Sequence, residues 1–189
     1  GSTVSRATFE AGYGSSRGVY EGAAAALGMT PAAYARGGEG ITIAWTTRET
    51  PAGLALVAAT GRGICAVSLG DEPAALEAEL AREFPRAALV RRDDDAALAR
   101  LADAVAEVLA GRGDAAALPV ELRGTPFQLA VWNALRAIPR GETRSYAELA
   151  AELGRPGAAR AVARACATNR VAVVVPCHRV VRGSGDVSG

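Results

Sequence analysis

Hydrophobic positions follow two different spacings along the chain after residue 40. Short segments rich in apolar and β-branched residues predict three strands, at 41–45, 54–59 and 64–69. The run Gly61–Gly63 predicts a hairpin turn between the last two. Apolar residues then recur at helical spacing over 76–84 and 98–109, and 119–123 predicts a further strand. This order predicts an α+β fold with a short antiparallel sheet.

The pattern becomes helical after Gly124. Apolar residues from Phe127 to Ile138 recur at helical spacing until a Pro-Arg-Gly run stops them. Ser145 with Glu148 predicts a capping box, and a four-residue turn then leads into a helix at 158–167. A helix pair joined by a short turn is typical of DNA-binding proteins, although the same outline occurs in pairs that bind nothing.

The helix at 158–167 has two unlike faces. Val162 and Cys166 belong to an apolar stripe that is expected to face the core, while Arg160 and Arg164 lie on the other side among alanines. Such a helix approaches a nucleic-acid groove closely, which matters most for a minor groove about 6 Å wide. The alternative is a surface helix whose arginines only keep the protein soluble.

Residues 1–38 predict a separate unit of short helices. Thr30 before Pro31 is a favourable helix start, and Gly/Ser-rich breaks separate the helices. The pattern fits a helix-turn-helix fragment and an ordinary helical hairpin equally well. A glycine-rich linker follows, so three units are expected, at 1–38, 39–118 and 119–189.

Charge is distributed unevenly although the net charge is only +1. All 21 basic residues are Arg, with 8 Arg against 13 acidic residues over 39–118 and 10 against 5 over 119–189. The C-terminal part is therefore the candidate for a polyanionic partner. The absence of Lys fits a GC-rich genome better than a special function.

Composition indicates a globular protein, because half of the residues are hydrophobic. No apolar run approaches a membrane span, and the first residues do not resemble a signal peptide, so we expect a cytoplasmic protein. The three cysteines are scattered without a ligand spacing, which predicts reduced thiols, no structural metal and no cofactor. The run Asp93–Asp95 predicts a solvated loop or a helix N-cap rather than a metal site.

The strongest chemical feature is Cys177, which follows the apolar run 171–175 and precedes the chain's only histidine, His178. A thiolate is the reactive form of cysteine, and a nearby base or positive charge lowers its ordinary pKa of about 8.5. His178 and Arg179 could supply both. Adjacent side chains do not face each other, so His178 is expected to act through a water molecule or across a kink. The alternative is an inert cysteine that ends a buried segment.

These residues resemble a known family. The run Pro176–Val180, with Arg160-Ala161-Val162 and Asn169 before it, resembles the alkylguanine-DNA alkyltransferases, or methylated-DNA–protein-cysteine methyltransferases, over about residues 41–189. The resemblance implies a ribonuclease H-like α/β domain and then a helical, winged-helix-like domain for DNA binding and catalysis. It also implies irreversible, single-turnover transfer of an alkyl group from O6 of guanine or O4 of thymine to Cys177.

The resemblance also implies roles for residues of the helix pair. Arg160 would enter the base stack in place of the flipped nucleotide, and Tyr146 would crowd the adjacent phosphate. Arg155, at the start of the second helix, and Arg164 on its outer face would contact DNA. Asn169 would hold the turn between that helix and the segment with Cys177.

Further implications concern the base pocket and the histidine. Val180 and Ser188 would line the pocket. The family places a glutamate behind the histidine, and here neither Asp186 nor any other residue can be assigned that role, because the chain ends at Gly189. Arg170 stands where many members have proline.

Residues 1–38 further resemble part of an AraC-type helix-turn-helix domain, through Ala11-Gly12-Tyr13 and the run Leu27–Pro31. That order of parts is found in Ada-like bacterial adaptive-response regulators, which implies a zinc domain and another helix-turn-helix ahead of residue 1. The expected partner is duplex DNA with an alkylated base, bound through the minor groove. The protein is expected to be a monomer and to have no membrane partner. Promoter DNA and RNA polymerase are further expected partners of a longer form.

Two alternatives to DNA repair remain at this point. The first is a transcriptional regulator whose N-terminal helices bind promoter DNA. The second is an ordinary Cys-His hydrolase, which would turn over many times on a small ester or amide. The lack of a second histidine and the Arg-bearing helix pair both disfavour the hydrolase.

Overall fold

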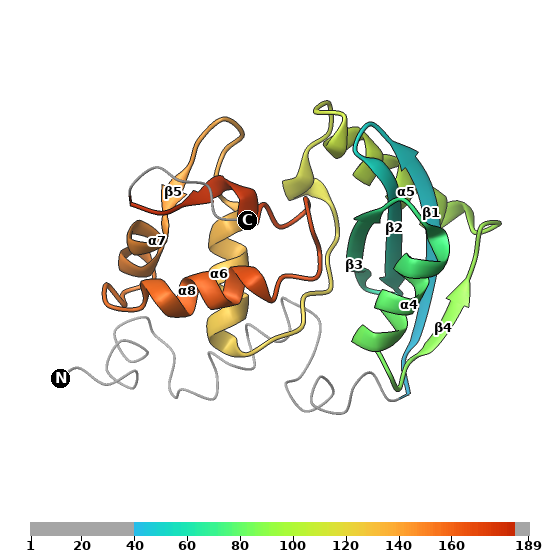
Figure 1. Ribbon diagram of the computed structural model, residues 1–189, viewed down its shortest axis with the longest axis horizontal. Helices are drawn as coiled ribbons and strands as arrows, with labels where there is room; N and C mark the ends of the chain where they lie inside the picture. The colour runs from blue at the N-terminus through green and yellow to red at the C-terminus, as the bar shows by residue number, and fades with distance from the viewer. Residues whose placement is uncertain (1–39, 184–189) are drawn as a thin grey trace.

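The computed structural model describes residues 40–183, which form an α+β fold with a sheet part and a helical part side by side (Figure 1). The sheet part contains the strands β1 (Thr42–Thr50), β2 (Gly53–Thr60), β3 (Gly63–Gly70) and β4 (Ala88–Arg91). Its helices are α4 (Pro73–Glu83), α5 (Ala96–Leu109) and the 3-10 turn η1 (Ala115–Ala117). The helical part contains α6 (Pro126–Arg136), β5 (Arg144–Ser145), α7 (Tyr146–Glu152), α8 (Ala159–Ala167), the 3-10 turn η2 (Cys177–Arg179) and β6 (Val180–Val181).

The sheet is mixed, with strand order β3-β2-β1-β4. The three predicted strands are confirmed, and they pair antiparallel as expected. The prediction of a wholly antiparallel sheet is wrong, because β4 pairs parallel with β1, with Ile43 opposite Leu89. The sequence pattern missed β4 because it has only four residues and is mostly exposed, so it lacks the alternation that marks a half-buried strand.

The free edge of β3 is covered by two segments of the helical part and its linker. Ile64 N–H donates to Pro119 O at 2.9 Å, and Val67 N–H donates to Arg170 O at the same distance. Gly63 has φ +139°, and a Cβ there would lie 2.7 Å from Pro119 O, so only glycine fits this approach. The strand expected at 119–123 is reduced to an isolated bridge between Ile64 and Val120. These contacts protect an edge that would otherwise offer unpaired backbone groups.

Helices pack on both faces of the sheet. On one face, Leu76 and Leu80 of α4 join a buried cluster with Ile43 and Trp45. On the other face, Val105 of α5 joins a larger cluster that extends into the helical part. Successive side chains of β2 point to opposite faces of the sheet. Val57 therefore belongs to the larger cluster, while its neighbours Leu56 and Ala58 belong to the smaller one.

The helical part is built on well-capped helices and shares its core with the sheet. The predicted capping box of Ser145 and Glu148 at the start of α7 is confirmed, and Thr125 with Gln128 forms a second one at α6. Trp132 and Leu135 of α6 lie in the larger buried cluster. That cluster joins both parts, which ties the position of α8 and η2 to the sheet.

Several expectations lie outside the described residues. They are the helix-turn-helix at 1–38 together with Asp186 and Ser188. No helix within residues 40–183 is long and apolar enough to cross a membrane.

Candidate functional site

Cys177 lies at the end of a tightly turned segment. Val174 N–H donates to Ala172 O at 2.8 Å, and Cys177 N–H donates to Val175 O at 2.9 Å. Each bond spans only two residues, which is the pattern of a γ-turn. Val173, inside the first turn, has φ +70°, a conformation that is uncommon for a β-branched residue. Such strain persists only where the surroundings enforce it, and it is often found at functional sites.

Asn169 fastens both ends of this segment. Its Nδ2 donates to Val175 O at 2.9 Å, and its Oδ1 accepts from Val171 N–H at 3.0 Å. Val171 and Val175 are both buried, so these two bonds satisfy backbone groups that water does not reach. Asn169 thus sits between the end of α8 and the cysteine segment.

The Cys177 thiol lies against α8. Its Sγ is 3.5 Å from the carbonyl oxygen of Cys166 in the last turn of that helix. A hydrogen bond from the Cys166 side chain holds the pKa of the Cys177 thiol below its ordinary value; burial opposes this and Asn169 adds to it. Because a lowered pKa increases the thiolate fraction, Cys177 fits the role of a nucleophile.

His178 follows Cys177 and is exposed to solvent over part of its surface. Within residues 40–183 no hydrogen bond joins His178 to Cys177. Partial burial lowers the pKa of His178 below 6.5, and the charge of Arg179 acts in the same direction. The imidazole is therefore neutral at pH 7 and able to accept a proton. The expectation that His178 acts indirectly, through a water molecule or across a kink, stays a prediction.

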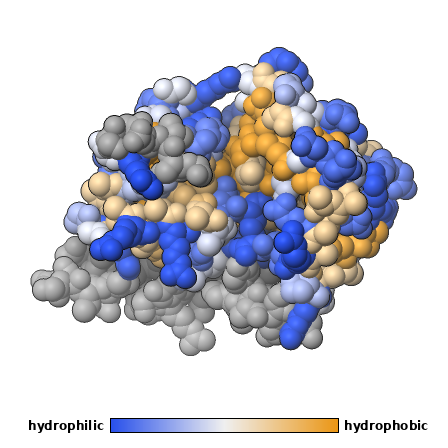
Figure 2. All heavy atoms as spheres, viewed as in Figure 1, coloured by the Kyte–Doolittle hydropathy of each residue, from blue (hydrophilic) through white to orange (hydrophobic). Residues whose placement is uncertain are grey.

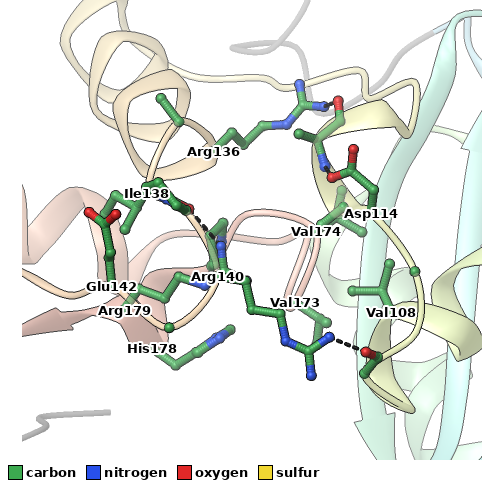
Figure 3. A pocket seen from close by; sticks show the side chains of 18 of the residues that line it. Val108, Asp114, Arg136, Ile138, Arg140, Glu142, Val173, Val174, His178 and Arg179 are labelled. Carbon is green, nitrogen blue, oxygen red and sulfur yellow. Dashed lines mark hydrogen bonds between the residues drawn. The ribbon is translucent and has the colours of Figure 1, made fainter.

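His178 lines a hollow of about 660 Å³ between the helical part and the 108–116 segment. Figure 2 shows apolar side chains gathered between the two parts, and Figure 3 shows how His178, Arg140 and Arg179 lie around the hollow. Arg179 donates to Ile138 O at 2.7 Å, and Arg140 donates to Gly111 O. These guanidinium groups therefore hold backbone segments together.

The carboxylates of this hollow do not form a pair with His178. Glu142, on the rim of the hollow, accepts from Arg144 at 3.1 Å, and Asp114 accepts from Ala116 N–H at 2.9 Å. No carboxylate raises the pKa of His178 in the part of the chain that the structure describes. The third partner of the Cys-His pair therefore stays without an assignment.

The helix pair presents the predicted basic residues to solvent. Arg160 and Arg164 of α8 are exposed, while Val162 and Cys166 are buried on the opposite face, as their spacing predicts. Arg155 lies in the turn before α8 with its guanidinium 5.5 Å from the ring centre of Phe127. It precedes the helix by four residues rather than standing in its first turn.

Tyr146 and Val180 lie deeper than the arginines. Tyr146 is the first residue of α7 and is half-buried against the larger core cluster. Val180 is fully buried and pairs with Arg144 between β6 and β5. The structure thus brings Cys177, Asn169 and α8 together at one point, and it places Tyr146 at the start of the neighbouring helix.

Cys166 is the neighbour that sequence reasoning did not assign to the site. Its position on the apolar face of α8 predicts burial, and the structure confirms burial with an exposed fraction of 9%. The helical pattern contains no signal that the chain returns to this face eleven residues later. Only the close turn after Asn169 creates that contact.

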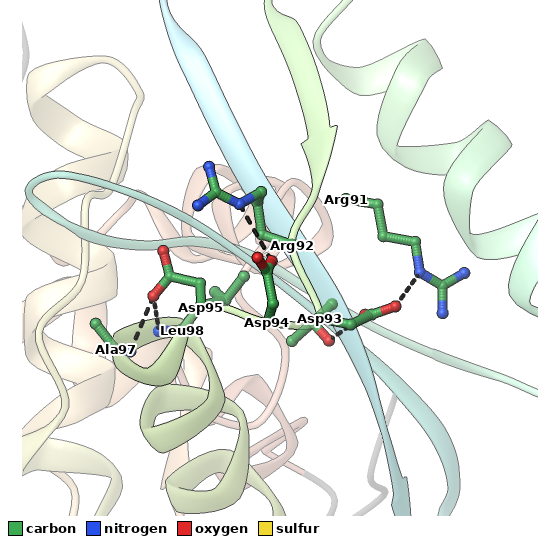
Figure 4. A network of polar contacts seen from close by, with 8 residues as sticks. Arg91, Arg92, Asp93, Asp94, Asp95, Ala97 and Leu98 are labelled. Carbon is green, nitrogen blue, oxygen red and sulfur yellow. Dashed lines mark hydrogen bonds and ion pairs between the residues drawn. The ribbon is translucent and has the colours of Figure 1, made fainter.

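The acidic run Asp93–Asp95 is not part of the site (Figure 4). Asp95 accepts from Ala97 N–H and Leu98 N–H, so the predicted N-cap is confirmed. Asp93 accepts from Thr46 at 2.8 Å, and Asp94 pairs with an arginine at 3.4 Å. Within the described residues no cluster of His, Cys, Asp and Glu has the makings of a metal site.

Two family models match the chain. The model of the 6-O-methylguanine DNA methyltransferase ribonuclease-like domain matches residues 43–122. The model of the 6-O-methylguanine DNA methyltransferase DNA binding domain matches residues 126–189. Together they cover the sheet part and the helical part.

Individual proteins show the same similarity. The Escherichia coli bifunctional transcriptional activator/DNA repair enzyme Ada is 44% identical, and the match covers 100% of this chain and 53% of the relative. The inducible methylated-DNA–protein-cysteine methyltransferase of Bacillus subtilis is 41% identical over 70% of this chain and 74% of the relative. The chain therefore spans about half the length of the first relative.

A solved structure shares the fold. The Mycobacterium tuberculosis OGT in complex with DNA has a TM-score of 0.62 and 33% identity, covering 77% of this chain and 83% of the other. The structure of the O6-methylguanine methyltransferase of the same organism has the same TM-score, with 34% identity over 78% of this chain and 84% of the other.

Proposed function

This chain belongs to the 6-O-methylguanine DNA methyltransferase family, and on that premise we propose that it repairs alkylated DNA by accepting the alkyl group on Cys177. The observation that carries the proposal is the Cys177 thiol itself, with its pKa lowered and its sulfur beside the Arg-bearing helix α8. We propose two units, 39–118 and 119–189, joined by one shared core.

The proposed reaction is a direct displacement. The Cys177 thiolate attacks the alkyl carbon attached to O6 of guanine, so a sulfur–carbon bond forms as the carbon–oxygen bond breaks. The bonding electrons pass to the guanine, which takes up a proton and is restored. We propose that neutral His178 accepts the thiol's own proton indirectly and passes it to solvent. Because the thioether is stable, each molecule reacts once.

The exposed face of the helix pair is the proposed DNA surface. Arg160 and Arg164 stand one turn apart on α8 among alanines, and Arg155 precedes them. Side chains of this type bind phosphates and reach into a minor groove. The excess of 10 Arg over 5 acidic residues in 119–189 favours this face over the sheet part.

Base flipping is proposed because a base inside the duplex cannot reach the half-buried Cys177. Arg160 would fill the gap left by the base, and Tyr146 would crowd the adjacent phosphate. Val180 and, outside the described residues, Ser188 would line the pocket. Asn169 would hold the thiol in place. A damaged base costs least to unstack, which supplies part of the selectivity.

The test is transfer of a labelled methyl group from O6-methylguanine in a duplex. We expect one label per molecule, its loss in Cys177→Ala, and its retention in the matched control Cys65→Ala. Arg160→Ala is expected to slow transfer from duplex DNA while leaving reaction with the free alkylated base unchanged. Repeated turnover on a small ester, or label kept by Cys177→Ala, would contradict the proposal.

A second candidate function is regulation by an Ada-like protein. The match to Escherichia coli Ada covers 100% of this chain, including residues 1–38, whereas the Bacillus subtilis match covers 70%. We therefore propose an AraC-type helix-turn-helix fragment at 1–38, with promoter DNA and RNA polymerase as partners of a longer form. Promoter binding that survives Cys177→Ala and changes with residues 15–20 would support it.

A further inference from the structure

The Cys177 thiol lies against the backbone of Cys166 although eleven positions separate the two cysteines. Cys177 Sγ donates to the Cys166 carbonyl oxygen at 3.5 Å, and the two thiols are close enough for each to shift the pKa of the other. Cys166 is buried on the inner face of α8, and Cys177 is half-buried at the start of η2. The alkyl-transfer reaction uses only Cys177, which leaves the second thiol unexplained.

The backbone around the pair is held firmly. Trp132 Nε1 donates to Ala165 O at 2.9 Å, which fixes the end of α8, and Asn169 fastens the returning segment. A disulfide forms without backbone movement only where the two chain segments already lie side by side. The end of α8 and the start of η2 lie side by side in this way, because the Cys177 sulfur is 3.5 Å from the backbone carbonyl of Cys166.

The two thiols differ in reactivity. The hydrogen bond from Cys166 favours the Cys177 thiolate, and the same contact together with burial raises the pKa of Cys166. Cys177 is thus the thiol that attacks an oxidant first. Once Cys177 is oxidised it no longer carries a thiolate, so the largest influence that keeps Cys166 protonated is removed.

We propose that Cys166 and Cys177 form a reversible disulfide when the protein meets hydrogen peroxide. The Cys177 sulfur attacks one peroxide oxygen, so a sulfur–oxygen bond forms, the oxygen–oxygen bond breaks, and water leaves. The Cys166 sulfur then attacks the Cys177 sulfur, which forms the disulfide and breaks the sulfur–oxygen bond. The departing hydroxide takes the proton of Cys166 and leaves as water. Two thiols are oxidised and one peroxide is reduced.

The disulfide would protect the acceptor thiol. A low-pKa cysteine without a resolving partner proceeds to sulfinic acid, which dithiol reductants do not reverse. The disulfide blocks Cys177 as an alkyl acceptor until a dithiol reduces it. Cys65 is no competitor, because it lies in the sheet core, bonded to Ala58 O, and burial raises its pKa to about 12.

The test uses the full chain, reduced, desalted and treated with hydrogen peroxide at low protein concentration. Trypsin cuts at Arg170, so it separates Cys166 in peptide 165–170 from Cys177 in peptide 171–179. We expect these peptides to appear as one joined species that dithiothreitol splits, and free thiols to fall from three to one. This readout needs no DNA, so its outcome is independent of alkyl transfer.

Two variants complete the experiment. In Cys166→Ser the Cys177 peptide should instead gain two oxygen atoms that dithiothreitol does not remove. In the matched control Cys65→Ser the joined peptide should persist. Separate peptides with an oxidised Cys177 in the wild-type protein would overturn the proposal. So would a bridge to Cys65 or a disulfide between two molecules.

Discussion

Replacing Asn169 by alanine tests whether the cysteine segment is held as the structure indicates. The substitution removes the bonds to Val175 O and Val171 N–H, at 2.9 and 3.0 Å. The lost bond to Val175 O costs about 1 kcal/mol, and the buried Val171 N–H left without a partner costs about 1–3 kcal/mol. The expected loss of unfolding free energy is therefore roughly 2–4 kcal/mol, or about 4–16 °C in Tm for a chain of this size.

Thermal unfolding followed by circular dichroism measures this loss. Asn169→Asp keeps the acceptor for Val171 N–H and loses only the donor to Val175 O. Its Tm should therefore lie between those of the wild type and Asn169→Ala. Asn133→Ala removes an exposed asparagine of α6 and should leave the Tm nearly unchanged. Methyl transfer by Asn169→Ala should slow by at least about tenfold, because a displaced nucleophile reacts poorly. A Tm equal to that of the wild type would refute the reasoning.

Two further substitutions and one titration test the core and the two reactive side chains. Glu121→Ala leaves the buried Arg123 without a counter-charge and should lower the unfolding free energy by about 3–5 kcal/mol, measured by urea titration. The control Glu107→Ala breaks an exposed ion pair and should change the unfolding free energy little. Cys166→Ala removes the interaction that lowers the pKa of Cys177, so the midpoint of the pH–rate profile for the reaction of Cys177 with iodoacetamide should rise. An unshifted midpoint would contradict the contact between the two cysteines. NMR titration should give the His178 ring a pKa below 6.5 in the folded protein. Between this pKa and that of the unfolded chain, the unfolded chain binds more protons. Stability should therefore rise with pH across that window.

Local sequence patterns predicted much of the fold. The capping box of Ser145 and Glu148 and the strands β1 to β3 follow from residue spacing alone, because each is decided within a few neighbouring positions. The parallel strand β4 did not, since four mostly exposed residues gain their strand character only from pairing with β1. Such pairing is a tertiary effect that overrides local propensity.

The candidate site, too, could be predicted only in part from the sequence. The exposed and buried faces of α8 follow from helical spacing, so Arg160 and Cys166 were placed correctly relative to the core. The approach of Cys166 to Cys177 depends on the γ-turns and on the side chain of Asn169, none of which leaves a periodic signal. The Glu121 ion pair, buried in the linker, was missed for the same reason.

The central claim is that Cys177 accepts one alkyl group from DNA and is consumed. Incubation of the full chain with an excess of duplex that contains O6-methylguanine, followed by tryptic mass spectrometry, tests it most directly. We expect peptide 171–179 to gain the mass of a single added methyl group in place of hydrogen, with the yield of restored guanine equal to the amount of protein. Guanine restored in amounts that exceed the protein, or a methyl group on any other peptide, would contradict the account.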